Sequence, residues 1–473
     1  MHHLDLRVPF IIRSIVTKSG EPEPKAGSAL GTILLVSAAF PPWTVVGAAR
    51  WEGFAPYLNA AGWRLSVLAE EPPLTLPTDS GRVARLGVGV SIRLVARRIP
   101  AWRDVTLRLL SKFRKSRQHV EQAGVTNSIE VLAAVKSGIV ASLHPRELFQ
   151  AAVQASSARF WIHDLCSSSK TFECANGAAM VISSGPPHDA HIAAAMIAAE
   201  RDIPHVVDLR DPWTDKALGS GIVNSMLGSP MSSRRECKVL SRASAIIVNT
   251  PSAAAALTKR LPQTIGRVHA VLNGSDSVAQ TARVLPHDAD YLVVHTGELY
   301  LDRDPRPFLR ALALVRSRNS QAQKRLRVVF MGNPAYIAKR FLSEWANDYG
   351  LADCFEERPF GTRAAATALM EEAAMLVAFQ GATPTQIPAK LFDYASNAAT
   401  ILALTGSDSA TAAVLSGTDA LVAPIDGDGA IAEHIESAFS RAISGVPIVP
   451  INADGRFARS IQAGILLQIL KKL

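Results

Sequence analysis

The sequence repeats one local pattern, in which a short apolar run suited to a buried strand is followed by a helix and then by another apolar run. Residues 31–37 (GTILLVS) and 64–69 (RLSVLA) are two such runs. Between them, apolar side chains at positions 51, 54, 55 and 58 recur at the spacing of one helix face. A strand–helix–strand unit places its two strands parallel in one sheet. The pattern therefore predicts an α/β fold built on parallel sheets.

A second series of the same kind begins at Tyr291. It predicts strands at 291–297, 327–333, 375–379 and 401–404, and helices at 305–318, 335–347 and 363–374. Two series in a chain of 473 residues indicate two domains, each large enough to have its own core. We expect the strands of both sheets to end at a cleft between the domains, where a ligand would bind.

The expected organisation has four segments. Residues 1–28 are a tail and linker, 29–280 a first Rossmann-like domain, 288–455 a second, and 456–473 a C-terminal helix that can cross back to the first domain. The predicted fold class is thus α/β, with two Rossmann-like domains whose parallel sheets face an interdomain cleft.

The net charge of +9 is concentrated in one segment. Residues 1–280 carry 31 basic and 21 acidic residues, and residues 82–117 alone hold eleven basic residues against one acidic residue. Beyond Pro100, an apolar stripe flanked by Arg and Lys is typical of a basic amphipathic helix. It indicates either contact with an anionic membrane surface or a solvated face over the protein's own core. Nucleic acid is a poorer partner, because no nucleic-acid-binding motif accompanies the charge.

Several other classes find little support in the sequence. Residues 26–49 are uncharged, but Pro41-Pro42 would break a spanning helix there. The four cysteines lack metal-binding spacing, so we expect free thiols in a reducing cytoplasm and no metal site. Neither GxSxG nor GxxxxGK[ST] occurs, which argues against hydrolases and P-loop proteins.

The stretch 382–406 (ATPTQIPAKLFDYASNAATILALTG) is the strongest candidate for a binding site. A Pro-punctuated loop leads into a helix that begins near Ala389 and places Lys390 and Asp393 in its first turn, on one face. Backbone N–H groups and the helix dipole favour an anion at such a place. A cation for a diphosphate beside a carboxylate for sugar hydroxyls suits a nucleotide-sugar site. The alternative is a surface salt bridge.

The first half offers polar residues at strand ends. Gly47 precedes the first long helix, and His188 follows the strand at 178–184. Asp208, Arg210 and Asp211 follow a short strand at 204–207. Three charged residues beside a buried strand indicate either an internal ion pair that ties the loop or a cluster that lines a cleft.

Six motifs in this order carry a family resemblance: FPPWTVVGAAR, SSGPPHDAH, DLRDPW, NGSD, HTGELYLDRDPRP and PAKLFDYASNAATILAL. On them the chain resembles the family-4 glycosyltransferases, which are retaining, nucleotide-sugar-dependent enzymes of the GT-B fold. The similarity runs from about residue 30 to the end. It is closest to the branch that makes bacterial cell-surface polysaccharides and glycolipids.

The resemblance implies a donor site in the second domain and an acceptor site in the first. The donor residues it implies are Gly47, Gly297, Arg303, Arg358, Pro359, Phe360, Lys390 and Asp393. The acceptor side is implied to hold His188, Asp208, Arg210 and Asp211, and the catalytic residues to be Arg303, Lys390, Asp393 and His188. In the family, the two cations hold the diphosphate and the carboxylate holds ribose.

The resemblance further implies transfer of a sugar, with retention, to a saccharide or lipid-linked acceptor, with neither cofactor nor metal. We expect a cytoplasmic protein; if the basic segment binds a membrane, the surface is the inner face of the plasma membrane. The chain departs from the family pattern at Thr385, where a glutamate is usual, and at Glu298, where an arginine is frequent. The alternatives are a nucleotide-sugar epimerase of the same fold and a catalytically degenerate subunit that binds nucleotide sugar.

Overall fold

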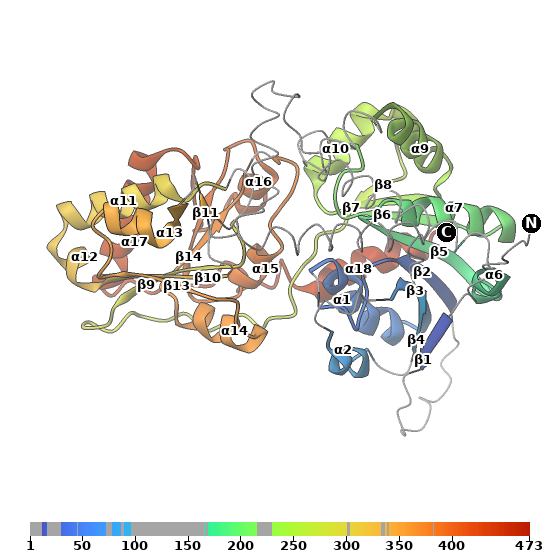
Figure 1. The fold of residues 1–473 in the computed structure, drawn as a ribbon, viewed down its shortest axis with the longest axis horizontal. Coiled ribbons are helices and arrows are strands. Elements are labelled where there is room, and N and C mark those ends of the chain that lie inside the picture. Colours follow the sequence, from blue (N-terminus) through green and yellow to red (C-terminus); the bar gives the residue numbers. More distant parts are fainter. Residues whose placement is uncertain are drawn as a thin grey trace, which may run out of the picture. The chain divides into compact units, whose positions relative to one another are not determined.

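The computed structural model describes most of the chain outside the basic segment and the first residues. The described residues are 12–16, 30–44, 46–71, 78–86, 89–95, 165, 169–214, 229–299, 303–332, 336–337, 340–381 and 383–473. They form two compact units (Figure 1). The first contains the described residues up to Val248 together with Leu257–His269 and Leu466–Leu473, and the second contains Asn249–Ala256 and Ala270–Ile465.

An eight-stranded sheet forms the centre of the first unit. Its strands, from one edge to the other, are β1 (Ile12–Val16), β4 (Val90–Val95), β3 (Trp63–Glu70), β2 (Gly31–Ser37), β5 (Ala178–Gly185), β6 (His205–Leu209), β7 (Ala245–Val248) and β8 (Val268–Ala270). Neighbours from β4 to β7 pair parallel, whereas β1 pairs antiparallel with β4. The predicted strand–helix–strand start of the chain is confirmed, because β2 and β3 are parallel neighbours on either side of a helix.

Helices follow most strands of the first unit. They are α1 (Val46–Ala60), α2 (Ser80–Ala84), α6 (Ser169–Cys174), α7 (Asp189–Arg201) and α9 (Ser229–Arg242). Helix α10 (Pro251–Arg260) begins in the second unit and ends in the first. Helix α1 buries Trp51, Phe54 and Leu58, and α7 packs its alanines and Ile197 against Leu34 and Val181 of the sheet. The buried face of α1 is the one that the apolar spacing of the sequence predicts.

The second unit is built on a six-stranded, wholly parallel sheet. Its order is β13 (Phe355–Arg358), β10 (Leu326–Met331), β9 (Tyr291–Thr296), β14 (Met375–Phe379), β15 (Thr400–Leu404) and β16 (Leu421–Ala423). Counted along the chain, this is the order 3-2-1-4-5-6 of a doubly wound sheet. The first unit repeats it, since β4, β3, β2, β5, β6 and β7 follow the same sequence of positions.

Both faces of the second sheet are covered. Alternate strand residues, such as Val293 and Val294, belong to two separate cores. One core includes α11 (Arg306–Arg318), α12 (Ser320–Arg325), α13 (Leu342–Asp348) and α17 (Asp428–Ile443); the other includes α14 (Arg363–Glu372), α15 (Lys390–Tyr394) and α16 (Ala410–Leu415). Figure 1 shows α11 and α17 on one side of this sheet and α14 on the other. Helix α18 (Arg459–Leu470) ends the chain.

Two local predictions need correction. The predicted tail contains strand β1, whose sequence IRSIV is rich in β-branched residues. Where the start of a helix was predicted, two short strands, β11 (Tyr336–Ile337) and β12 (Arg340–Phe341), pair antiparallel. Helix α13 begins only at Leu342, because Glu344 caps it by accepting the Phe341 N–H at 2.8 Å. Helix α15 is a single turn.

Most of the basic segment 82–117 lies outside the described residues. Its three described members make internal contacts: Arg82 pairs with Glu52, Arg85 with Asp79, and Arg93 donates to Cys174. The described part of the uncharged stretch 26–49 forms β2 and the start of α1. No helix in the described ranges is long and apolar enough to cross a bilayer.

The buried carboxylate of Asp208 connects three secondary-structure elements of the first unit. Asp208, at the end of β6, is 0% exposed. Its Oδ1 accepts from Arg50 Nε at 3.1 Å, and its Oδ2 accepts from Trp51 Nε1 at 2.7 Å and from Ser184 Oγ at 2.8 Å. Since Arg50 and Trp51 belong to α1 and Ser184 to β5, one charge joins a helix to two strands. Three donors compensate a carboxylate that would otherwise be very unfavourable in the core.

We predict that Asp208→Asn lowers the free energy of unfolding by about 3 kcal/mol, because it leaves the buried Arg50 guanidinium without its counter-charge. Six of the seven tryptophans lie at or before Trp213, so tryptophan fluorescence in urea reports mainly on the first unit. Asp79→Asn is the control: it removes an exposed ion pair with Arg85 but keeps a side chain able to cap α2, and should change stability by less than about 1 kcal/mol. Equal losses in the two variants would contradict this account of Asp208.

Candidate functional site

The strand order locates a candidate ligand site in each unit. In a doubly wound sheet, ligands bind outside the carboxyl ends of the strands where the order reverses. That point lies between β9 and β14 in the second unit and between β2 and β5 in the first. Most of the residues singled out from the sequence lie at or beside these two places.

Helix α15 makes hydrogen bonds to both backbone groups of the last residue of β9. Lys390 Nζ donates to the carbonyl oxygen of Thr296, the last residue of β9. Tyr394, one turn further along the same helix face, accepts the Thr296 N–H at its hydroxyl oxygen at 2.8 Å. The i,i+4 spacing of the two side chains lets one helical turn hold both backbone groups of Thr296. The Lys390 ammonium is thereby fixed at the switch point of the sheet.

The ammonium lies in a partly buried, cation-rich environment. Burial and the nearby Arg303 guanidinium lower the pKa of Lys390 to about 7, against the opposing charge of Glu298. Its second contact is His295 Nε2, at 3.4 Å. Burial and the Lys390 charge hold the pKa of His295 well below its usual range, so this imidazole is neutral. Lys390 and Arg303, which the sequence placed at the donor diphosphate, are thus near each other in the structure.

Gly297, which follows the last residue of β9, leaves space beside the Lys390 ammonium. Its φ of +98° lies in the region that favours glycine, and a Cβ there would come within 3.0 Å of Lys390 Nζ. The Gly297 N–H donates to the Met331 carbonyl at 2.7 Å, while the next strand end, at Gly332, donates to the Arg358 carbonyl at 2.9 Å. Gly297 and Gly332 therefore add no side chain of their own at the ends of β9 and β10, as a close approach by a ligand requires.

The loop before α15 is held by Gln380, a residue that no sequence motif indicated. Its Nε2 donates to the carbonyls of Thr383 at 2.8 Å and Gln386 at 2.6 Å, and its Oε1 accepts from the Thr411 hydroxyl. Thr250 adds a bond to the Thr385 carbonyl at 2.5 Å. Lys390 therefore follows a loop with fixed geometry. Because α15 is a single turn, its dipole adds little, and the charge of Lys390 carries the preference for an anion.

Asp393 lies on the other side of the same helical turn. Its Oδ1 accepts from the Ser275 hydroxyl at 2.5 Å. Ser275 belongs to the NGSD motif and pairs through its backbone with the residues just before α18. The motif thus fixes the Asp393 carboxylate, and no described residue donates to its other oxygen. The salt bridge between Lys390 and Asp393, which was the alternative interpretation of this pair, does not form.

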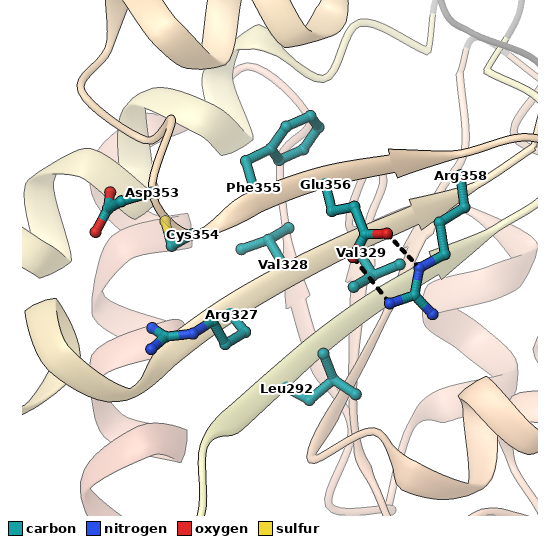
Figure 2. A pocket seen from close by; sticks show the side chains of 9 residues that line it. All are labelled: Leu292, Arg327, Val328, Val329, Asp353, Cys354, Phe355, Glu356 and Arg358. Carbon is teal, nitrogen blue, oxygen red and sulfur yellow. Dashed lines mark hydrogen bonds and ion pairs between the residues drawn. The ribbon is translucent and has the colours of Figure 1, made fainter.

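Arg358, Pro359 and Phe360 are placed differently from the Lys390 group. The Arg358 side chain makes a bidentate ion pair with Glu356, at 2.7 and 2.8 Å. Figure 2 shows the pair beside a pocket on the sheet face, also lined by Leu292, Arg327 and Val329. Leu292 and Arg327 come from the first halves of their strands, so this pocket lies away from the carboxyl edge. Pro359 and Phe360 are exposed. Arg358 contacts the ends of β9 and β10 through its backbone carbonyl, which accepts the Gly332 N–H.

In the first unit, Arg210 organises the strand ends. Its guanidinium donates to the carbonyls of Gly47 and Pro186. Burial lowers the pKa of Arg210, against the opposing charges of Asp208 and Asp211. A Cβ at Gly47 would overlap the guanidinium, at 2.3 Å from its Nη1. Gly47 therefore gives room to an internal arginine in this structure. The buried Asp208 is inaccessible, so its effect on any ligand is indirect.

His188 belongs to an aromatic cluster at the end of β5. Its ring stacks on Trp213, with centroids 5.3 Å apart and an interplanar angle of 14°, and His191 lies beside both. Burial and the Arg210 charge lower the pKa of His188 to about 3. Behind the cluster, Ser183 Oγ lies 2.8 Å from both His191 Nδ1 and His205 Nε2. Burial lowers the pKa of His205 to about 3. These rings are neutral, so the cluster suits uncharged hydroxyl groups better than anions.

The described part of the chain contains no group of three or more His, Cys, Asp or Glu side chains arranged to hold a metal ion. Sequence reasoning missed His295, Gln380, Tyr394, Ser275 and the His191–Ser183–His205 chain. Most of them lie inside the six motifs: His295 in HTGELYLDRDPRP, Ser275 in NGSD, Tyr394 in PAKLFDYASNAATILAL, and Ser183 and His191 in SSGPPHDAH. Gln380 and His205 lie outside these motifs, and their roles became recognisable only through contacts in the fold.

No protein-family model and no curated protein matches the sequence. Solved structures match almost the whole chain. HepE from Anabaena, solved with UDP and glucose, has a TM-score of 0.57 at 12% identity, covering 94% of this chain and 100% of its own. Sucrose-phosphate synthase from Thermosynechococcus elongatus has a TM-score of 0.57 at 13% identity, covering 93% and 98%. A protein assigned as a UDP-N-acetylglucosamine 2-epimerase, from Listeria monocytogenes, has 0.51 at 9%, covering 93% and 95%.

These matches show the class of fold. The chain is an α/β protein with two sheets of parallel strands and is similar to two-domain, Rossmann-like proteins of the GT-B fold. The predicted fold class is confirmed in this respect, and the predicted cleft stays a prediction. At 9–13% identity the matches leave the activity to be argued from the residues.

We predict that the buried imidazoles make the first unit sensitive to acid. A histidine with a folded-state pKa near 3 stays neutral at pH 5, while in the unfolded chain, with a pKa near 6.5, it is protonated. Stability is therefore complete above pH 6.5 and is lost as the pH falls, by about 2 kcal/mol at pH 5 for His205 alone. Urea unfolding at pH 7 and pH 5 measures this loss.

The His205→Gln variant keeps an amide in reach of Ser183 but does not titrate. Its loss of stability between pH 7 and pH 5 should be smaller than that of the wild type by about 2 kcal/mol, whatever its stability at pH 7. His287→Gln changes an exposed histidine and should lose as much as the wild type. If His205→Gln loses as much as the wild type does, burial of a neutral His205 is not the cause.

Proposed function

We propose that the protein is a glycosyltransferase that moves a sugar from a nucleotide-diphosphate sugar to a saccharide or lipid-linked acceptor. One observation carries the proposal most strongly: the Lys390 ammonium at the switch point of the second sheet, beside Gly297 and near Arg303. A cation with open backbone around it, at the carboxyl end of β9, suits a diphosphate. The GT-B fold and HepE, which was solved with UDP and glucose, support the same donor class.

In the proposed reaction, the bond between the sugar's anomeric carbon and the diphosphate oxygen breaks, and its electron pair stays on the diphosphate. Lys390 and Arg303 stabilise the charge that develops there. The acceptor hydroxyl forms the new bond, and its proton passes to a leaving-group oxygen. Attack from the face that the diphosphate leaves gives retention, as in the family that the chain resembles. The Asp393 carboxylate, held by Ser275, is assigned to donor hydroxyls.

The first unit is assigned to the acceptor. Its His188 has a pKa of about 3 and is therefore a weak base, so its proposed task is to hydrogen-bond a sugar hydroxyl rather than to remove a proton. The ring stack of His188 on Trp213 gives an apolar face of the kind that packs against a sugar. We further propose that no metal or cofactor is needed, because two side-chain cations can neutralise the diphosphate. A cytoplasmic role in cell-surface polysaccharide or glycolipid synthesis follows from the family resemblance.

The second candidate is a nucleotide-sugar epimerase, which the similarity to the Listeria protein favours. Both activities need the same diphosphate site, so Lys390 does not separate them. An epimerase converts its nucleotide sugar without any acceptor, whereas a transferase releases the nucleoside diphosphate only when an acceptor is present. Nuclear magnetic resonance of the sugar, with and without saccharide acceptors, distinguishes the two. A chain that binds the donor without either change would be a degenerate binding subunit.

We predict that Lys390→Met weakens binding of the nucleotide sugar by about tenfold to a hundredfold, because a hydrogen bond to a charged group is lost. Turnover should fall by about 10² to 10³. The protein should stay folded, since an apolar side chain replaces a partly buried cation. Thermal stabilisation by UDP-, GDP- and dTDP-glucose selects the donor first. Lys324→Met, in the exposed part of α12, is the matched control, and unchanged turnover in Lys390→Met would refute the site.

We also predict that donor affinity falls as the pH rises through about 7. Lys390, with a pKa of about 7, loses its charge above that pH, and its affinity for an anion should then fall by up to tenfold per pH unit. UDP-glucose is the right probe, because its diphosphate carries no proton that titrates here, unlike the terminal phosphate of UDP. Calorimetry between pH 6 and pH 9 measures the profile. A flat wild-type profile would contradict the role of Lys390.

A further inference from the structure

His295 shares the corner of the site with Lys390 and is 1% exposed. Its Nδ1 lies 2.8 Å from the carbonyl oxygen of Val377 in β14. A carbonyl oxygen can only accept, so the ring proton must be on Nδ1. In the neutral ring, Nε2 then carries a lone pair. That lone pair faces the Lys390 ammonium, 3.4 Å away.

The orientation of the ring is held by its neighbours. The centroid of the His295 ring lies 5.1 Å from that of Phe330 and 5.0 Å from that of Phe379, the latter nearly perpendicular at 84°. Phe308 closes the same aromatic cluster behind them. A flipped or protonated ring would lose the Val377 bond or place two cations in contact. The cluster therefore maintains one tautomer in one orientation.

We propose that His295 is a positioning residue of the donor site: its neutral Nε2 and the Thr296 carbonyl hold the Lys390 ammonium in place without a counter-ion. The identity of the anion rests on the proposed function. Both acceptors are uncharged, so the positive charge remains available to an incoming diphosphate. An acidic partner in the same place would hold the lysine as firmly but would neutralise it.

The other charged groups around Lys390 fit this role. Arg303 and Glu298 follow β9, and they lower and raise the Lys390 pKa respectively. Asp393, on the same helix, has its Oδ1 bonded to Ser275. Among the described residues, neither carboxylate makes an ion pair with Lys390. The competing explanation is that His295 only fills the aromatic core, in which case the ionisation of Lys390 would not depend on it.

Three substitutions separate the two contacts of His295. His295→Asn can still donate to Val377 from its amide but is too short to reach Lys390. His295→Gln is long enough to present its amide oxygen where Nε2 lies. His295→Phe keeps the ring shape without either polar contact and suits the aromatic surroundings if the asparagine variant folds poorly. Phe308→Leu disturbs the same core without facing Lys390 and is the control.

The first measurement uses the ligand-free protein. The rate of acetylation of Lys390 by acetic anhydride, followed by mass spectrometry from pH 5 to pH 10, gives the midpoint of its ionisation. Loss of an acceptor disfavours the charged form, so the midpoint should move to lower pH by on the order of one unit in His295→Asn and His295→Phe. It should stay within a few tenths of a unit of the wild type in His295→Gln and in Phe308→Leu.

The second measurement is the affinity for UDP-glucose at pH 7, which should fall about tenfold in His295→Asn and His295→Phe and recover in His295→Gln. An unchanged Lys390 midpoint in both variants, or an equal change in Phe308→Leu, overturns the proposal. If the midpoint shifts as expected but the wild type binds no nucleotide sugar, the positioning role of His295 is supported and the proposed function fails.

Discussion

The hold that α15 has on Thr296 is the interaction on which the candidate site depends. The Tyr394 hydroxyl accepts a hydrogen bond from the Thr296 N–H, and Lys390 donates one to the Thr296 carbonyl. A single helical turn therefore satisfies both backbone groups at the end of β9. The position of the ammonium follows from the sheet itself rather than from a surface side chain that is free to rotate. Gln380 extends this control to the preceding loop. A site built in this way is ordered before any ligand arrives, which favours binding because little conformational freedom is then lost.

The two units have the same strand order, but the charged side chains at their strand ends have different partners. In the first, the carboxylate at the end of β6, Asp208, is neutralised by Arg50, and the Arg210 guanidinium is taken up by backbone carbonyls. The side chains left at the end of β5 are neutral imidazoles and an indole. In the second, the Lys390 ammonium at the strand end donates to two neutral acceptors, His295 Nε2 and the Thr296 carbonyl. The same architecture therefore offers one group of side chains suited to hydroxyl groups and one suited to an anion, which is what the proposed transfer needs.

Sequence reasoning recovered the elements whose pattern is local. The strands β2, β3, β5, β9, β14 and β15 and the helices α11 and α14 were predicted close to their observed bounds, because a buried parallel strand has a continuous apolar sequence and a packed helix has a periodic one. The antiparallel pair β11–β12 was missed, since its strands are two residues each. In the site, Lys390 could be chosen from its motif. The contacts that fix it could not be predicted, because Lys390 and His295 lie 95 residues apart, His295 and Val377 lie 82 residues apart, and these groups meet only in the folded sheet.

Lys390 shows why burial strengthens such a site. Lowering the pKa of a lysine from 10.5 to about 7 means that the charged form is disfavoured, relative to water, by on the order of 5 kcal/mol. A neutral acceptor such as His295 Nε2 offsets part of this, and a carboxylate would offset more but would compete with the ligand. An arriving diphosphate supplies the missing counter-charge and restores the ordinary preference for the ammonium. Relief of the unfavourable burial of the Lys390 charge thus contributes to the binding free energy of an anion. A neutral ligand in the same place gives no such relief.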